Sequence, residues 1–214
     1  MNYLNSLTTF FYNIVPGFIF LLFNSFYYKT QLFENTNIDI LQVVIVSVLL
    51  GFVFQSFTKK FRDAYLNKKI LDEIGENDKS LLSDADKILE SIPCTKNKEK
   101  DRTEKNIYLM HNFLIAKYGA VVFPEFFSER LALWSNMMFA SLITVILIFI
   151  MPFYNLSPEP FSGSILLDLF LLILFTYHSY GITKKYQYAL YDSIVRTFVS
   201  VQSLASKPLG DTVK

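Results

Sequence analysis

Four apolar stretches of about 20 residues each limit what this chain can fold into. They cover residues 8–28, 38–58, 131–154 and 163–181. An α-helix rises 1.5 Å per residue, so each stretch is long enough to cross the ~30 Å hydrocarbon core of a bilayer. A soluble domain of 214 residues would not need four such runs for its interior. The sequence therefore predicts an all-α integral membrane protein with four transmembrane helices.

A charged segment separates the second apolar stretch from the third and divides the chain into four parts. We expect a first transmembrane hairpin at residues 1–58 and a small cytoplasmic helical domain at residues 59–130. A second transmembrane hairpin follows at residues 131–183, and a cytoplasmic C-terminal helix and tail at residues 184–214. Within the cytoplasmic domain, Gly75, Pro93 and Gly119 are the expected ends of three helices. Pro124 suits the first turn of a helix that leads into the third span.

The basic residues predict the orientation of the spans. Of the 20 Lys and Arg residues, 14 lie in residues 59–130 and five lie from Lys184 onward. The loop between the third and fourth spans, residues 154–162, has none. Because cytoplasmic loops of membrane proteins carry an excess of Lys and Arg, we expect residues 59–130 and both termini on the cytoplasmic side. The Lys-, Asn- and Phe-rich composition is typical of a bacterium, so the predicted location is the inner membrane.

An apolar stripe continues the fourth span into the tail. Its members recur at near-helical spacing: Tyr186, Leu190, Ile194, Phe198 and Val201. We expect Leu190, Ile194 and Phe198 to form an interface with the central cytoplasmic helices or with a neighbouring subunit. Attachment to the membrane surface is the weaker alternative, because few basic residues accompany the stripe.

Small and polar residues mark one predicted face of the second span. Ser47, Gly51 and Gln55 are spaced four residues apart. Small residues let two helices approach closely, and a glutamine can form a hydrogen bond between helices in a membrane. This face either lines a pore or contacts another subunit, or it simply packs inside the four-helix unit.

Asp168 is the only formal charge well inside an apolar stretch. Ionisable side chains at membrane depth are costly and usually face a cavity, a partner or water. Asp168 therefore either lies on a pore face together with Ser47, Gly51 and Gln55, or caps a span that begins later, at the interface.

The sequence contains no signature of catalysis or of metal binding. It has one cysteine, Cys94, and no phosphate-binding loop, nucleophile elbow or zinc-protease motif. We therefore expect no catalytic residue, no cofactor, no metal and no enzymatic activity. A net charge of +1 also gives no reason to expect direct nucleic-acid binding.

The layout of the whole chain resembles that of small four-span membrane proteins of bacterial anti-phage systems, such as CRISPR accessory membrane proteins and the membrane component of Kiwa. The resemblance concerns architecture and rests on no sequence motif. It implies an oligomeric inner-membrane effector or anchor that couples a cytoplasmic protein partner or signal to membrane permeability. The expected partners are thus the lipid bilayer, further copies of the chain and a cytoplasmic protein.

Two other functions fit the same pattern. The first is a small-solute transporter or constitutive channel with Asp168 on the path. The second is a non-conducting scaffold that tethers a soluble complex to the membrane.

Overall fold

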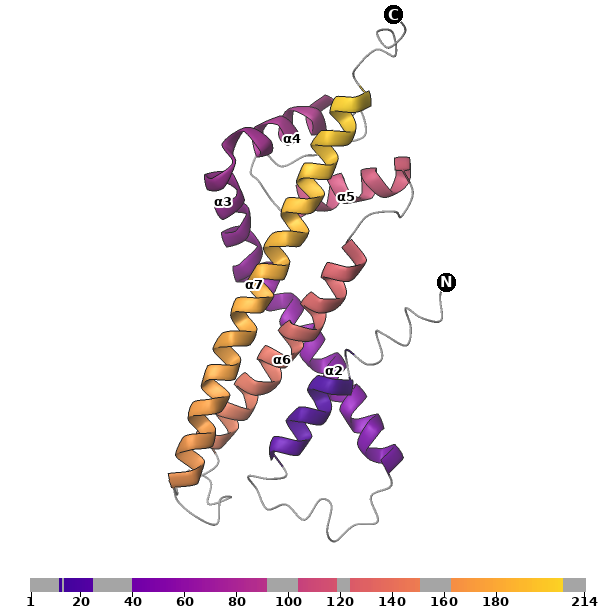
Figure 1. The fold of residues 1–214 in the computed structure, drawn as a ribbon. Coiled ribbons are helices and arrows are strands. Elements are labelled where there is room, and N and C mark those ends of the chain that lie inside the picture. The colour runs from indigo at the N-terminus through magenta and orange to yellow at the C-terminus, as the bar shows by residue number, and fades with distance from the viewer. Residues whose placement is uncertain are drawn as a thin grey trace, which may run out of the picture. The chain divides into compact units, whose positions relative to one another are not determined.

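A computed structural model describes residues 12, 14–24, 40–91, 104–118, 124–150 and 163–205. This part of the chain is helical and contains no strand. After an N-terminal helix, Ile14–Asn24, the elements are α2 (Ile40–Phe61), η1 (Arg62–Leu66), α3 (Asn67–Asn77), α4 (Lys79–Ser91), α5 (Glu104–Tyr118), α6 (Pro124–Ile150) and α7 (Gly163–Ala205), as drawn in Figure 1. The all-α prediction is confirmed for these residues.

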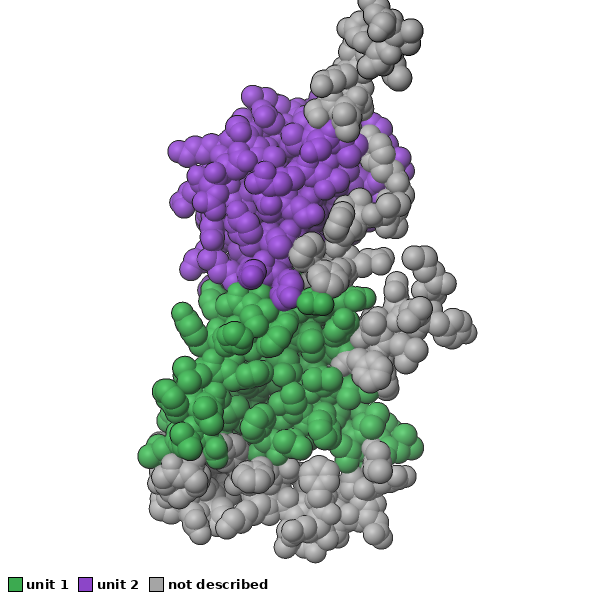
Figure 2. Space-filling model, viewed as in Figure 1, with its two compact units in different colours: residues 1–61, 129–183 green, residues 62–128, 184–214 purple. Residues whose placement is uncertain are grey.

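The chain divides into two compact units, coloured separately in Figure 2. Unit 1 consists of Met1–Phe61 and Glu129–Thr183, and unit 2 of Arg62–Ser128 and Lys184–Lys214. Two long helical runs contribute to both units. One is α2, η1 and α3, which follow one another from Ile40 to Asn77, and the other is α7.

Three helices in the described part are long and apolar enough to cross a membrane: Leu41–Asn77, Glu129–Ile150 and Leu166–Gln202. The chain is accordingly an α-helical membrane protein. The N-terminal helix Ile14–Asn24 is apolar but shorter than a span. Most of the first predicted span, residues 8–28, coincides with it, and the remainder of that stretch lies largely outside the described residues.

Unit 1 packs its helices through a narrow stripe on α2. The buried positions Ser47, Gly51, Phe54 and Thr58 recur every three or four residues and so keep to one face of the helix. Phe54 meets the N-terminal helix edge to face, with its ring centroid 5.3 Å from that of Phe20. Apolar side chains outside this contact face are left exposed, as expected of helices solvated by lipid: on α2 they include Leu41, Ile45, Leu49, Phe52 and Phe57.

Unit 2 has an apolar core of its own. Its largest fully buried side chains are Leu66, Ile70, Ile74, Leu89, Met110, Leu114, Val195 and Phe198. They come from η1, α3, α4, α5 and the C-terminal part of α7. Phe198 meets Phe113 of α5 edge to face, with ring centroids 5.7 Å apart.

The expected helix boundaries in this segment agree with the structure except at Gly75. The second predicted helix is α4, α5 ends at Tyr118, immediately before Gly119, and α6 begins at Pro124. Gly75 does not end a helix, because α3 continues to Asn77 and Gly75 is buried within it. The break comes at Asp78, whose φ and ψ of −144° and 80° are not helical.

Candidate functional site

A layer of buried polar side chains crosses unit 1 near the C-terminal end of α2. We call it the polar layer, and each of its members is at most 1% exposed: Thr58 of α2, Ser135 and Asn136 of α6, and Ser179 and Thr183 of α7. Buried polar groups in a membrane-spanning region must find hydrogen bonds within the protein, because lipid tails offer none. In the polar layer, close packing of the helices must therefore be combined with hydrogen bonds for the buried polar groups.

Antiparallel packing of α6 against α7 places these side chains at similar heights. The Thr176 hydroxyl lies 2.9 Å from the Ser141 hydroxyl and fixes the relative register of the two helices. Counting back from Ser141, Asn136 lies ~7.5 Å along α6 at 1.5 Å per residue. Counting forward from Thr176, Ser179 and Thr183 lie ~4.5 and ~10.5 Å along α7, on either side of that height.

The hydroxyls of the polar layer bond mainly to their own helices. Thr58 bonds to the carbonyl of Phe54, and Thr183 Oγ1 lies 2.8 Å from the carbonyl of Ser179. Such bonds to the preceding turn satisfy a hydroxyl in a membrane at little cost to the helix. Thr58 also joins two helices, because its hydroxyl lies 3.1 Å from Asn136 Oδ1.

Two polar atoms of the layer have no hydrogen-bond partner among the described residues. They are Asn136 Nδ2 and Ser179 Oγ. The Thr58 hydroxyl has a single proton, which it donates to the carbonyl of Phe54, so the Asn136 amide can also be turned round to donate from Nδ2 to this hydroxyl. In either orientation one polar atom of the amide has no partner among the described residues, at a cost of about 1–3 kcal/mol.

Of the three residues of the predicted polar face on α2, the structure buries Ser47 and Gly51 and exposes Gln55. Ser47 packs against the N-terminal helix so closely that a Cβ on Gly17 would lie 1.9 Å from its carbonyl oxygen. Positions four apart drift by about 40° around a helix of 3.6 residues per turn. Eight residues after Ser47, Gln55 has consequently left the contact face.

Asp168 lies near the beginning of α7 and is partly exposed. None of the residues described in the structure forms a hydrogen bond or an ion pair with it. Its neighbour Leu169 is buried with Ile148 and Leu172 in a small apolar cluster. Asp168 is therefore far along α7 from the polar layer, since Ser179 is 11 residues, or ~16 Å, further on.

The predicted tail interface belongs to unit 2. Ile194 and Phe198 are buried there, and Leu190 is half-buried. Polar contacts join the same part of α7 to α3: Lys184 Nζ lies 2.7 Å from Glu73 Oε2, and Asn77 Nδ2 lies 3.3 Å from the Tyr188 hydroxyl. The tail stripe thus packs on helices of its own chain.

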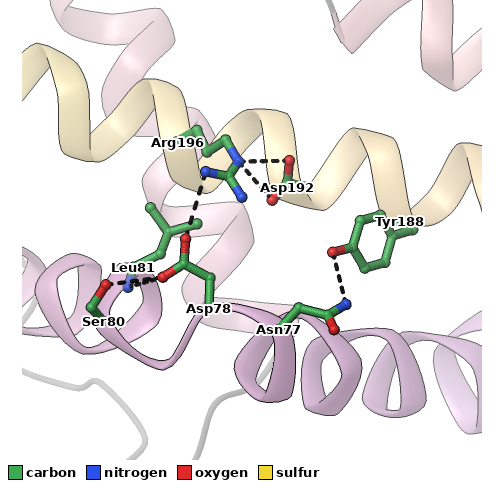
Figure 3. A network of polar contacts seen from close by, with 7 residues as sticks. All are labelled: Asn77, Asp78, Ser80, Leu81, Tyr188, Asp192 and Arg196. Atoms are coloured by element: carbon green, nitrogen blue, oxygen red, sulfur yellow. Dashed lines mark hydrogen bonds and ion pairs between the residues drawn. The ribbon is translucent and has the colours of Figure 1, made fainter.

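Asp78 forms polar contacts with three other residues of unit 2, as Figure 3 shows. Its Oδ1 accepts hydrogen bonds from the Leu81 backbone N–H at 3.1 Å and from the Ser80 hydroxyl at 2.9 Å. Asp78 thereby caps the N-terminus of α4. Its Oδ2 lies 3.6 Å from an Arg196 nitrogen. The hydrogen bond from Leu81, followed by that from Ser80, lowers the pKa of Asp78 below its ordinary value.

An apolar cleft of about 370 Å³ opens between α6 and α7 in unit 1. Its lining is almost entirely carbon and comprises Phe61, Met138, Phe139, Leu142, Val145, Ile173, Thr176, Tyr177 and Tyr180. No carboxylate or imidazole reaches this cleft. Within the described residues, moreover, no three His, Cys, Asp or Glu side chains are grouped so that they could hold a metal ion.

Sequence reasoning did not single out the polar layer or Asp78. The four-residue spacing of Ser179 and Thr183 was a usable sign of a buried polar face. In comparisons of sequence and of structure, no protein-family model, no characterised protein and no solved structure matches this chain.

Proposed function

We propose that the chain is an oligomeric effector or anchor of a bacterial inner membrane, with four spans and both termini in the cytoplasm. In this proposal a cytoplasmic protein or signal acts on unit 2, and the spans of unit 1 respond by changing membrane permeability. The asymmetric distribution of Lys and Arg supports the orientation. The resemblance in layout to anti-phage membrane proteins supports the biological role, and the genes next to this one test it.

The proposal depends on the two helical runs that contribute to both units. A helix that continues from one unit into the next can transmit a displacement as a rigid lever. Both Thr58 and Thr183 lie within three residues of the position at which their helix passes from unit 1 to unit 2. The polar layer is therefore the part of unit 1 that a movement of either helix would displace first.

If the helices moved in this way, the polar atoms without partners would favour the entry of water. Separation of α2, α6 and α7 would let water hydrate the Asn136 amide and Ser179 Oγ, and hydration would offset part of the packing that is lost. A hydrated layer across the spans lowers the barrier to ion passage. Several subunits, or a path between them, are needed for a pore, because four helices barely enclose one.

Ion flux into proteoliposomes tests the coupling without a known partner. Asp78→Ala removes the hydrogen bonds that cap α4 together with the contact to Arg196, and it is expected to raise K⁺ flux above that of the unaltered protein. Adding Asn136→Leu should abolish the gain, because leucine removes the amide that water would hydrate. Lys87→Ala, which removes an exposed ion pair with Asp84, is the matched control and should leave the flux unchanged.

Two results would replace the proposal by one of its alternatives. Steady flux through the unaltered protein, abolished by Asp168→Asn, would identify a constitutive channel or transporter. If no variant conducts and expressing cells never depolarise, the chain is a scaffold. A measured mass in mild detergent equal to one 24.9 kDa chain would exclude the oligomeric pore.

A further inference from the structure

One flank of α2 carries a polar group on a surface that is otherwise apolar. Gln55 is exposed there, about 60° around the helix from the exposed aromatic side chain of Phe52. Gln55 forms no hydrogen bond with any residue that the structure describes. The flank belongs to the run Leu41–Asn77, which is long and apolar enough to cross a membrane.

An amide in this position needs a partner that lipid does not supply. Gln55 precedes Lys59, the first lysine of the run, by four residues, or ~6 Å along the helix, which puts the amide on the hydrocarbon side of the charged end. Transfer of an amide from water to hydrocarbon without hydrogen bonds is unfavourable by several kcal/mol. The described residues therefore leave this flank without the partner that its amide needs.

We propose that a second copy of this chain covers the flank, with Gln55 of each copy bonded to Gln55 of the other. A side-chain amide both donates and accepts hydrogen bonds, so two identical amides related by a two-fold axis satisfy one another. The surface is thus self-complementary in polarity, as a two-fold interface requires.

This interface specifies one contact between the copies of the proposed oligomer. It rests on the proposed function only in requiring more than one copy. It does not depend on ion conduction, and it can therefore be tested by proximity alone. A chain that pairs through Gln55 but never conducts would leave the interface standing as a scaffold contact.

Cysteine cross-linking in native membranes is the direct test. In a Cys94→Ser background, Phe52→Cys should form a disulfide-linked dimer of twice the 24.9 kDa chain mass on mild oxidation. The control is Tyr177→Cys on α7. Phe52 lies six residues before Thr58 and Tyr177 six residues before Thr183, and both are well exposed, at 51% and 76%. Tyr177→Cys should give no dimer.

The amide is tested in the same assay. Gln55→Leu is expected to lower the Phe52→Cys dimer yield in line with a 3- to 30-fold weaker association, the range known for hydrogen bonds between helices in membranes. Gln55→Asn keeps an amide and should retain more of the yield. Equal yield from Tyr177→Cys, no dimer from Phe52→Cys, or no effect of Gln55→Leu would each overturn the proposal. Unchanged far-ultraviolet circular dichroism of Gln55→Leu verifies that the helices remain formed.

Discussion

Replacement of Gly17 by alanine should disrupt the contact between the N-terminal helix and α2. A Cβ built on Gly17 would lie 1.9, 2.7 and 2.9 Å from the oxygen, carbonyl carbon and Cα of Ser47. These atoms belong to the backbone of α2, which cannot rotate away as a side-chain end would. The two helices would have to separate by about 1.5 Å to restore an ordinary contact of 3.4 Å.

The expected loss of stability follows from that separation. Overpacking by one methyl group in a tightly packed interior typically costs about 1–3 kcal/mol. Moving the helices apart also weakens the edge-to-face contact of Phe20 with Phe54, one turn further along the N-terminal helix. We therefore expect Gly17→Ala at the upper end of this range. The gain in helix propensity from glycine to alanine, about 0.5–1 kcal/mol, offsets only part of it.

Gly181→Ala is a matched control in the same unit. Nothing lies within 4 Å of a Cβ at Gly181, so that variant should be neutral or more stable by up to about 1 kcal/mol. Both variants can be unfolded with sodium dodecyl sulfate in mixed micelles and followed by circular dichroism. Equal stability of Gly17→Ala and the unaltered protein would refute the close approach of Gly17 to Ser47.

Unit 2 should respond to pH at two positions outside the spans. The pKa of Asp78 is lowered by its hydrogen bonds, so its contribution to stability is present above its ordinary pKa of 3.8 and is lost as the pH falls below it. Asp78→Ala should lower the thermal unfolding midpoint at pH 7, and Asp78→Ser, which can still cap α4, should restore part of it. Burial lowers the pKa of His111 below its ordinary 6.5, so the native state loses stability as the pH falls from about 6.5, where the unfolded chain binds the proton more tightly. His111→Gln should remove this part of the pH dependence, as measured by unfolding at pH 7.5 and pH 5.5.

The helices could be predicted well from the sequence because their signals are local. Apolar length predicted the positions of α2, α6 and the first half of α7, and Pro124 marked the first residue of α6. The end of α3 was missed because it depends on Asp78, which leaves the helix in order to cap the next one. A carboxylate three residues before an apolar pair is a weaker sequence signal than Gly75, although its hydrogen bonds from Leu81 and Ser80 cap α4.

The candidate site was much less predictable than the helices. Which polar residues of α2 are buried depends on the face that its neighbours cover, and a four-residue repeat follows such a face only for a short distance. Ser47 and Gly51 remain on it, and the next contact falls on Phe54 rather than on Gln55. The polar layer also combines residues from three helices, and no single stretch of sequence indicates that Thr58 meets Asn136.

The composition of unit 2 has a consequence for the order in which the protein is made. Its core needs Val195 and Phe198, yet α6 and most of α7 are synthesised before these residues and after α5. Until α7 has left the ribosome, α3, α4 and α5 therefore expose the apolar side chains that Phe198 would cover. Because domains generally fold as units, unit 2 can be completed only after α6 and most of α7 have been synthesised. A chain that stops before Val195 leaves unit 2 open, a form that chaperones and proteases can recognise.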